Sequence, residues 1–243
     1  KVTTPAHRGG GGAATIHDER GAKEEGLEDL LHYDAYRRGN FVDHWLPAEV
    51  TLSDVSRRGG SLGLALTAYA ARTGRSRAIP VLYLEGNERR GDAFLRVRKR
   101  FRLAPDTAHL AVDYWLQPEG IEAPSRFGVE LNLAFYMGPP PDRFVEINGE
   151  RPADPSFFAV AEVTEVREVR IVDAWLGLAA HLGLEPPATL WRCPVQTISQ
   201  SESGYERVAQ QITLLPHWPL GGSEGAAALR LVLTIESWEA AGG

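Results

Sequence analysis

From about residue 40 to residue 239, apolar and polar side chains alternate in short runs separated by turn residues. This period-two alternation is typical of strands with one buried face. Turn clusters such as EGNERRGD, APDT and GPPPD, and the Asn-Gly pair in RFVEINGE, separate the runs. Many strands without regular helices between them predict an all-β fold, a large antiparallel β-sandwich. The predicted strands are FVDHWL, LGLALTAYA, IPVLYLEG, AFLRVRKRFRL, HLAVDYWLQ, RFGVELNLAFYM, RFVEINGE, VREVRIVDAWLGLAAHLGL, TLWRCPV, QQITLLPHW and ALRLVLTIESWE.

A differently patterned region precedes these strands. Residues 1–22 contain HRGGGGAA and are expected to form a flexible glycine-rich lead-in, whereas residues 23–240 are expected to form one β-sandwich domain. Leucines at 27, 30 and 31, together with the tyrosine at 36, are spaced for a short helix. Asp34 lies one turn before two arginines on this predicted helix, which Gly39 would end.

The run FLRVRKRFRL predicts a strand with two different faces. One face is apolar except for Lys99. The other face carries Arg96, Arg98, Arg100 and Arg102, which repel each other unless carboxylates oppose them across the sheet. The simpler interpretation is a solvated face paired with neighbouring acids. The more specific interpretation is a docking surface for an acidic partner domain.

Two other runs have unusual polar faces. RFGVELNLAFYM has an apolar stripe opposite Glu130 and Asn132, which form either a polar outer face or part of a binding surface. PVQTISQSESGYE, residues 194–206, would place Gln196, Gln200 and Glu202 on one face and a threonine and three serines on the other. Because neither face can form a hydrophobic wall, this run is either a solvated loop or a polar surface that holds a ligand or partner.

Composition narrows the class of protein. With 243 residues, the chain is long enough for one large all-β domain or two small domains. Its net charge of −6 and pI near 5.7 do not predict a nucleic-acid partner. No apolar run approaches the roughly 18–20 residues that span a membrane. The single cysteine, Cys193, excludes an internal disulfide framework and fits a reducing, cytoplasmic location. Because the first residue is Lys1, we expect a processed product or a piece of a longer chain.

Recognisable catalytic and metal-binding patterns are absent from the sequence. There is no GxSxG elbow, no Walker loop and no dinucleotide fingerprint after a strand. None of the seven histidines stands in HxH or HxxxH spacing, so we expect no metal and no cofactor. TIHDE and VDHW place Asp beside His, but adjacent residues on a strand point to opposite faces. Carboxylate pairs can be assembled from distant segments, so acid–base chemistry stays open.

The six tryptophans are numerous for this length, and large aromatic residues flank residues 194–206. Sugar sites combine flat apolar platforms with long amide and carboxylate side chains. For Trp191 and Trp218 the sequence favours neither core packing nor ligand contact over the other. For Trp175 and Trp238 we expect core packing. The residues in or beside the run with sugar-binding chemistry are Trp191, Gln196, Gln200, Glu202, Tyr205 and Trp218.

Three separated segments carry a resemblance to a known family. IHDERGAKEEGLEDLLHYDAYRRGNFVDHWLP, FGVELNLAF and WRCPVQTISQSESGYERVAQQITLLPHW resemble signature stretches of the C-terminal domain of glycoside hydrolase family 57 enzymes, the α-amylase and 4-α-glucanotransferase group. The similarity runs in the same order from about residue 16 to residue 238.

The resemblance implies a large antiparallel sandwich like that of galactose mutarotase and the rear domain of α-mannosidases. In the family, this domain follows a catalytic barrel that carries the nucleophile Glu and the acid/base Asp of a retaining mechanism. This chain has no counterpart of that barrel, so no catalytic residue is carried over. An excised domain of this kind is expected to leave a sheet edge or an apolar patch exposed.

Three functions follow as hypotheses. In the first, the chain is a non-catalytic sandwich that supports the barrel and contributes to the rim of an α-glucan cleft, with residues around 191–202 facing the cleft or the domain junction. In the second, it is a free-standing mutarotase-like aldose epimerase with a Glu base and a His acid, a hypothesis that rests on fold analogy. In the third, it is a binding module whose arginine face holds a partner. The sequence does not decide between hydrolase and transferase activity of the parent enzyme.

Overall fold

The computed structural model describes residues 27, 34, 36–57, 68–76, 79–105, 107–135, 142–201, 204–221 and 227–239. Within these residues the chain forms one short helix and eleven strands. The elements in chain order are β1 (Asn40–Pro47), α1 (Leu52–Arg57), β2 (Tyr69–Ser76), β3 (Ile79–Arg90), β4 (Ala93–Leu103), β5 (His109–Glu119), β6 (Ser125–Leu133), β7 (Arg143–Ile147), β8 (Ala161–Asp173), β9 (Leu178–Ser201), β10 (Gly204–Leu220) and β11 (Ala227–Ser237).

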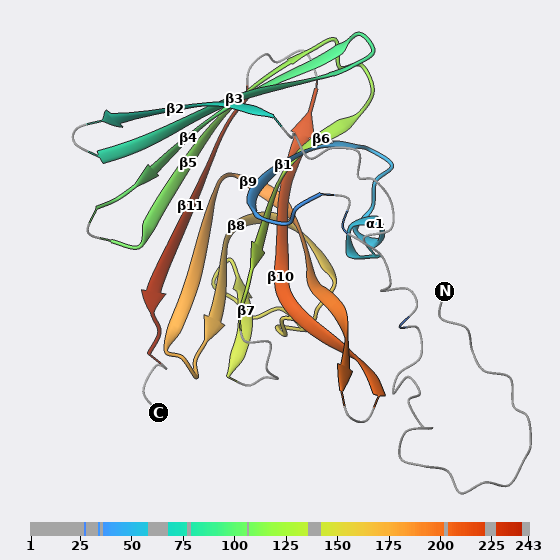
Figure 1. Ribbon diagram of the computed structural model, residues 1–243, viewed down its shortest axis with the longest axis vertical. Helices are drawn as coiled ribbons and strands as arrows, with labels where there is room; N and C mark the ends of the chain where they lie inside the picture. Colours follow the sequence, from blue (N-terminus) through green and yellow to red (C-terminus); the bar gives the residue numbers. More distant parts are fainter. Residues whose placement is uncertain are drawn as a thin grey trace, which may run out of the picture.

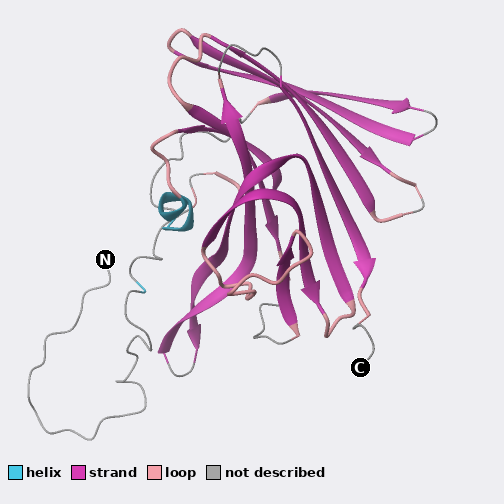
Figure 2. Ribbon diagram, turned by 180° about the vertical axis from the view of Figure 1, so that it is seen from behind, coloured by secondary structure: helices cyan, strands magenta, loops and turns pink. Residues whose placement is uncertain are grey.

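The strands hydrogen-bond into one antiparallel sheet that folds over itself into two layers (Figure 1). The strand order is β1-β6-β10-β9-β11-β5-β4-β3-β2, with β8 paired to β9 and β7 paired to β8. The long strand β9 belongs to both layers, because residues 178–185 pair with β11 and residues 189–201 pair with β10. Seen from behind, the same arch of β9 joins the layers (Figure 2).

The alternating pattern forms the core between the layers, as the sandwich prediction requires. Inward-facing residues of β6 and β10 meet inward-facing residues of β4, β5 and β11. Tyr114 and Phe127 pack edge to face across the two layers, with ring centroids 5.8 Å apart. The shared cluster includes Leu95, Val97, Val112, Tyr114, Phe127, Val129, Leu131, Ile212, Leu214, Leu229 and Leu231. The prediction of an all-β antiparallel sandwich is therefore confirmed.

Several predicted boundaries differ from the structure. The cluster EGNERRGD was predicted as a turn, but β3 continues to Arg90 and only Gly91 and Asp92 turn. The run at 166–184 divides into two strands at the turn of residues 174–177, and TLWRCPV continues through PVQTISQS as part of β9. Most of LGLALTAYA lies outside the described residues.

Residues 28–33 of the predicted N-terminal helix and the lead-in of residues 1–22 lie outside the described residues. Residues 36–39 are irregular, so the helix does not extend to Gly39 as predicted. The described helix is α1, which the apolar pattern did not predict. Its first turn is a capping box, since the Thr51 hydroxyl accepts a hydrogen bond from the Asp54 amide and the Asp54 carboxylate accepts one from the Thr51 amide.

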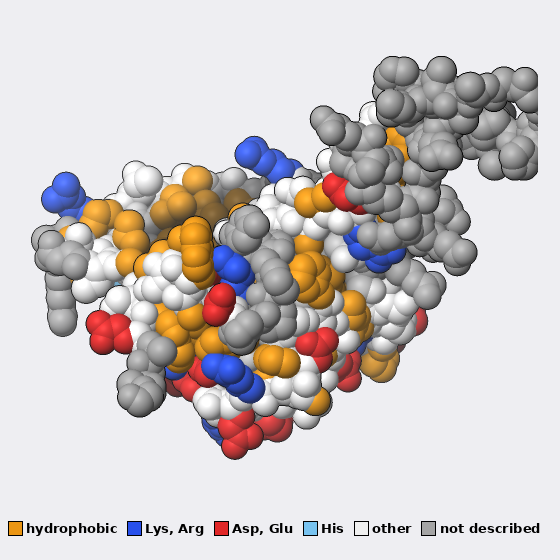
Figure 3. All heavy atoms as spheres, turned by 90° about the horizontal axis from the view of Figure 1, so that it is seen from below, with side chains coloured by type: hydrophobic (Ala, Val, Ile, Leu, Met, Phe, Trp, Pro, Cys, Tyr) orange, Lys and Arg blue, Asp and Glu red, His pale blue; other side chains and the backbone are white. Residues whose placement is uncertain are grey.

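The end of the sandwich opposite the arch of β9 leaves apolar side chains at the surface (Figure 3). Four large apolar side chains are exposed around the β8–β9 turn and the end of β11, namely Trp175, Leu176, Leu178 and Ile235. The prediction that Trp175 packs in the core is wrong, because 71% of its surface is exposed. Trp238 does pack beside Phe144, with ring centroids 5.7 Å apart. Among the described helices, none is long and apolar enough to cross a membrane.

Candidate functional site

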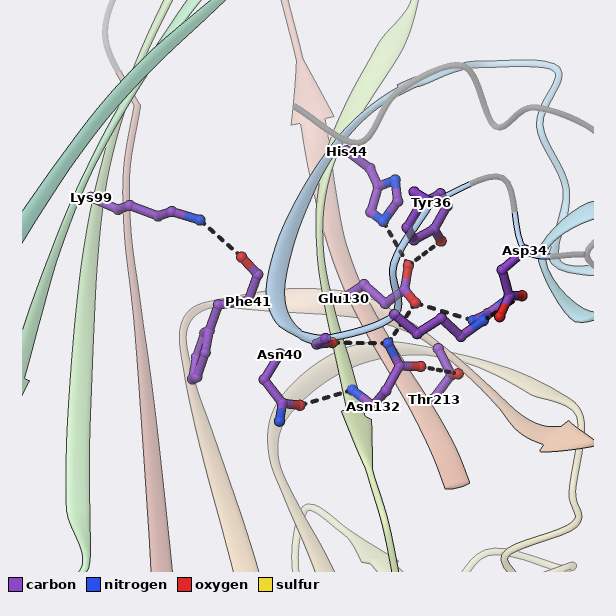
Figure 4. Close-up of polar contacts among 11 residues, drawn as sticks. Asp34, Tyr36, Asn40, Phe41, His44, Lys99, Glu130, Asn132 and Thr213 are labelled. Carbon is purple, nitrogen blue, oxygen red and sulfur yellow. Dashed lines mark hydrogen bonds and ion pairs between the residues drawn. The ribbon is translucent and has the colours of Figure 1, made fainter. Parts of the chain in front are cut away.

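Glu130 lies at the centre of a buried polar cluster on the outer face of β6 (Figure 4). One carboxylate oxygen accepts hydrogen bonds from Arg38 at 3.1 Å and from the Asn132 amide at 2.7 Å. The other oxygen is 2.7 Å from His44 Nε2 and also accepts a hydrogen bond from the Tyr36 hydroxyl. A carboxylate offers about four lone-pair positions, so the protein itself occupies the whole acceptor capacity of Glu130.

The same donors keep Glu130 ionised. Burial by itself raises the pKa of this carboxyl, but the hydrogen bond and charge of His44, the Tyr36 hydroxyl and the Arg38 guanidinium outweigh burial and hold the pKa at about 2. The Tyr36 pKa is raised well above its ordinary value, by burial and by the adjacent carboxylate. Tyr36 therefore stays a neutral donor. The cluster is built to keep one buried negative charge fully hydrogen-bonded.

The cluster holds the segment that enters β1. We call residues 36–39 the entry segment. Besides the bonds of Tyr36 and Arg38, the Asn132 side chain donates to the Gly39 carbonyl at 2.9 Å, and the Asn40 side chain accepts from the Asn132 backbone amide at 2.9 Å. Arg38 also meets Asp34 at 2.9 Å. Glu130 and Asn132 are therefore buried beneath the entry segment, and the interpretation of a plain solvent face is wrong.

A second buried cluster lies on the inner side of β1. Lys99 forms an ion pair of 2.9 Å with Asp43 and donates to the Phe41 carbonyl at 2.8 Å, while the Tyr69 hydroxyl also donates to Asp43. Asp43 and His44, adjacent in sequence, thus point to opposite faces, as expected for a strand. Phe41 has a φ of 60° at a bulge of β1, which turns its carbonyl towards Lys99.

Residues 196–201 and 204–209 are the paired strands of a hairpin, in which the ends of β9 and β10 pair only with each other among the described strands. Gln200 is opposite Tyr205 in the register and lies on the same face as Gln196, and both Gln200 and Tyr205 are exposed. The opposite face carries Thr197 and Ser199. Neither face is a core wall, as the pattern predicted, and the run is a strand rather than a loop. Glu202 lies outside the described residues.

The two tryptophans beside the hairpin do not form open platforms. Trp191 and Trp218 are 2% and 5% exposed. The Trp191 indole donates to Glu162 and packs against His217 and beneath the Arg126 guanidinium. In this chain both rings serve packing, and Tyr205 is the flanking aromatic residue that reaches solvent.

The arginines of β4 meet carboxylates of the neighbouring strands. Glu85 on β3 lies 3.7 Å from Arg96 and 3.1 Å from Arg98. Asp113 on β5 lies 2.9 Å from both Arg100 and Arg102. These ion pairs are the pairing with neighbouring acids that the interpretation of a solvated face predicted. The interpretation of a docking surface stays a prediction.

Sequence reasoning missed the residues that complete the two buried clusters. Lys99 stood out only as an exception on an apolar face. His44, Tyr36 and Arg38 come from segments nearly a hundred residues away from Glu130, so no local pattern connects them.

The fold defines a large antiparallel β-sandwich domain in which the buried charge clusters around Glu130 and Asp43 hold the chain's own segments together. Residues 1–231 match the family model described as Alpha-amylase/4-alpha-glucanotransferase, C-terminal, and the chain belongs to this family.

Curated relatives agree with this assignment. Alpha-amylase 1 of Dictyoglomus thermophilum is 30% identical over 206 residues, which is 83% of this chain and 28% of the relative. The 4-alpha-glucanotransferase of Thermococcus kodakarensis is 29% identical over 223 residues, 91% of this chain and 30% of the relative. The chain therefore spans less than a third of the length of the relatives that it matches.

A solved structure has the same fold. The 4-alpha-glucanotransferase of Thermococcus litoralis superposes with a TM-score of 0.61 at 21% identity, covering 87% of this chain and 29% of that one. A putative aldose 1-epimerase of Escherichia coli K12 has a TM-score of 0.49 at 15% identity, covering 90% and 88% of the two chains, a likeness too remote to indicate function.

Proposed function

We propose that this chain is the non-catalytic C-terminal sandwich of a longer α-glucan-acting enzyme, a 4-α-glucanotransferase or an α-amylase, in which it supports a catalytic barrel. The observation that carries the proposal is the family match over residues 1–231, combined with relatives more than three times as long as the matched region. Glu130, the carboxylate with a neighbouring histidine, is fully buried and has no acceptor position left for a substrate.

The exposed apolar end of the sandwich supports a buttress role. Trp175 and its neighbours Leu176, Leu178 and Ile235 present large apolar side chains that a monomeric domain rarely leaves together in water. We assign this end to contact with the rest of the enzyme. We also place the enzyme in the cytoplasm, because Cys193 is buried and is the single cysteine of this 243-residue chain, which therefore has no internal disulfide.

The test of the non-catalytic role is to incubate the purified chain with maltoheptaose and to separate the products by chromatography. We expect maltoheptaose to stay intact, while the full-length enzyme converts it to shorter or longer maltooligosaccharides. Turnover by the chain alone would contradict the proposal.

The epimerase hypothesis is tested by measuring the anomer interconversion of glucose by polarimetry. With the purified chain, interconversion should proceed no faster than in buffer, and a faster rate would favour the epimerase hypothesis.

We propose further that the face of the β9–β10 hairpin carrying Gln196, Gln200 and Tyr205 contributes to the glucan cleft or to the junction beside it. The exposed Tyr205 ring next to the Gln200 amide supports contact with sugar, because a sugar ring stacks on an aromatic face while its hydroxyls bond an amide.

Calorimetric titration with maltoheptaose at millimolar concentration tests the sugar contact. We expect weak binding that Gln200→Ala with Tyr205→Ala reduces at least about tenfold, a loss of about 1.4 kcal/mol. Ser199→Ala, on the opposite face of the same hairpin, is the matched control and should bind as the unmodified chain does. Equal binding by all three proteins would leave only the junction role for this face.

A further inference from the structure

The outer face of β3, β4, β5 and β11 carries more positive than negative charge. Because side chains alternate along each strand, six arginines from three strands lie on this one face. Cross-strand pairing brings Arg100 opposite Asp113, and Asp113 opposite Arg230 on β11. We call this surface the basic face. Its arginines are Arg89, Arg96, Arg98, Arg100, Arg102 and Arg230.

Too few carboxylates lie on the basic face to neutralise it. Glu85 serves Arg96 and Arg98, and Asp113 serves Arg100, Arg102 and, at 4.0 Å, Arg230. Glu185 is also opposite Arg230 in the register. Glu119 of β5 and Glu236 of β11 lie on the same face, so five acids face six guanidiniums. The balance is unusual on a chain whose net charge is −6.

A hollow of about 280 Å³ continues the basic face towards β8. Gly183 and Val232 are part of its lining, with Arg230 and Arg167 among the charged residues around it. Within the described part of the chain, Arg167 has no carboxylate at ion-pair distance. The charged lining of the hollow is therefore two guanidiniums, of Arg167 and Arg230, and one carboxylate, of Glu185.

Trp115 lies among these arginines and is 38% exposed. The Arg100 guanidinium lies 5.2 Å from its ring centroid. Tryptophan and arginine are the residue types that carry most of the affinity at protein interfaces, because they combine large contact area with directional donors. An exposed tryptophan within an arginine array has the composition of a protein-binding surface.

We propose that the basic face binds an acidic polypeptide segment in extended conformation, with carboxylates at alternate residues. Glu85 and Asp113 show the fit, since each carboxylate lies between neighbouring guanidiniums at distances of 2.9 to 3.7 Å. Alternate residues of any extended chain are about 6.6–6.8 Å apart, so the carboxylates of such a segment match the spacing of the arginines along β4. Each guanidinium has five N–H donors and retains some for a partner.

The probe is a fluorescent peptide of alternating glutamate and serine, about eight residues long, which is enough to follow the arginines of β4. Fluorescence anisotropy at about 50 mM salt should show saturable binding that weakens steeply at higher salt, because the charges are exposed and screened. A glutamine–serine peptide of the same length should not bind. Equal binding of the two peptides would overturn the proposal.

Arg98→Gln combined with Arg230→Gln removes one arginine beside each shared acid, and both side chains are about half exposed, so the fold should persist. We expect affinity for the acidic peptide to fall about fivefold, the effect of two exposed ion pairs. Arg37→Gln combined with Arg75→Gln removes the same charge from exposed positions away from the basic face and should leave affinity unchanged. An equal loss of affinity in both double variants would show that binding depends only on the net charge of the chain, and it would overturn the proposal. So would binding of inorganic polyphosphate without binding of the acidic peptide.

Discussion

At the scale of single residues, Glu130 is the most constrained side chain of the outer face. It is fully buried and ionised, and its four hydrogen bonds come from three separate segments. A buried charge is tolerated only when it is paired and hydrogen-bonded. Its task is therefore to fix the entry segment against β6.

Replacing Glu130 by glutamine should destabilise the domain by about 3 kcal/mol at neutral pH, because it leaves buried donors without their carboxylate. Urea unfolding followed by tryptophan fluorescence measures this free energy. Glu150→Gln, at an exposed position, is the matched control and should change stability by no more than about 0.5 kcal/mol. A cost as small as that of the control would contradict the role of Glu130.

The low pKa of Glu130 also predicts how stability depends on pH. Because the folded-state pKa is about 2, below the ordinary value of 4.5, the ionised carboxylate stabilises the fold above pH 4.5. This contribution is lost as the pH falls from 4.5 towards 2. The difference in unfolding free energy between the unmodified chain and Glu130→Gln should therefore shrink over that range. A difference that stays constant from pH 6 to pH 2 would show that the carboxylate's charge does not act.

At the scale of elements, the β9–β10 hairpin differs from the rest of the sheet. Residues 189–195 of β9 belong to the sandwich, whereas from residue 196 onwards the strands pair only with each other among the described strands. An isolated two-stranded hairpin is marginally stable in water, because no third strand or apolar face supports it.

We expect the amides of residues 196–209 to exchange with solvent far faster than those of residues 189–195 and 211–217 in the isolated chain. Opening of the hairpin should cost on the order of 1 kcal/mol. Exchange in the packed segments should instead require the full free energy of unfolding of the domain. Hydrogen exchange followed by mass spectrometry measures both. In the full-length enzyme the hairpin should become protected, and equal exchange in both proteins would argue against a contact there.

At the scale of the whole molecule, a buried ion pair joins distant parts of the sheet. β1 and β2 are the two ends of the strand order, yet Asp43 of β1 contacts Tyr69 of β2 and Lys99 of β4. Contacts made by the side chains of Asp43, Tyr69 and Lys99 therefore join the two layers at this edge.

Lys99→Met should destabilise the domain by about 3 kcal/mol or more, since it leaves the Asp43 carboxylate buried without its cation. Adding Asp43→Asn should recover much of that loss. A double-mutant cycle in urea measures the coupling, and Arg98→Met, on the exposed face of the same strand, is the control. Additive costs in the double variant would show that the two charges are not coupled.

The sequence by itself determined the fold class and most strands, because period-two alternation and turn residues are local signals. It also determined the arginine ladder and the two polar faces of residues 196–201. The tertiary structure alone decided that Glu130 and Asn132 are buried, that Trp175 is exposed while Trp191 and Trp218 are not, and that Lys99 pairs with Asp43. These outcomes depend on which distant strand or segment packs on each face of a strand. The alternation of apolar and polar residues within a strand does not specify that packing partner.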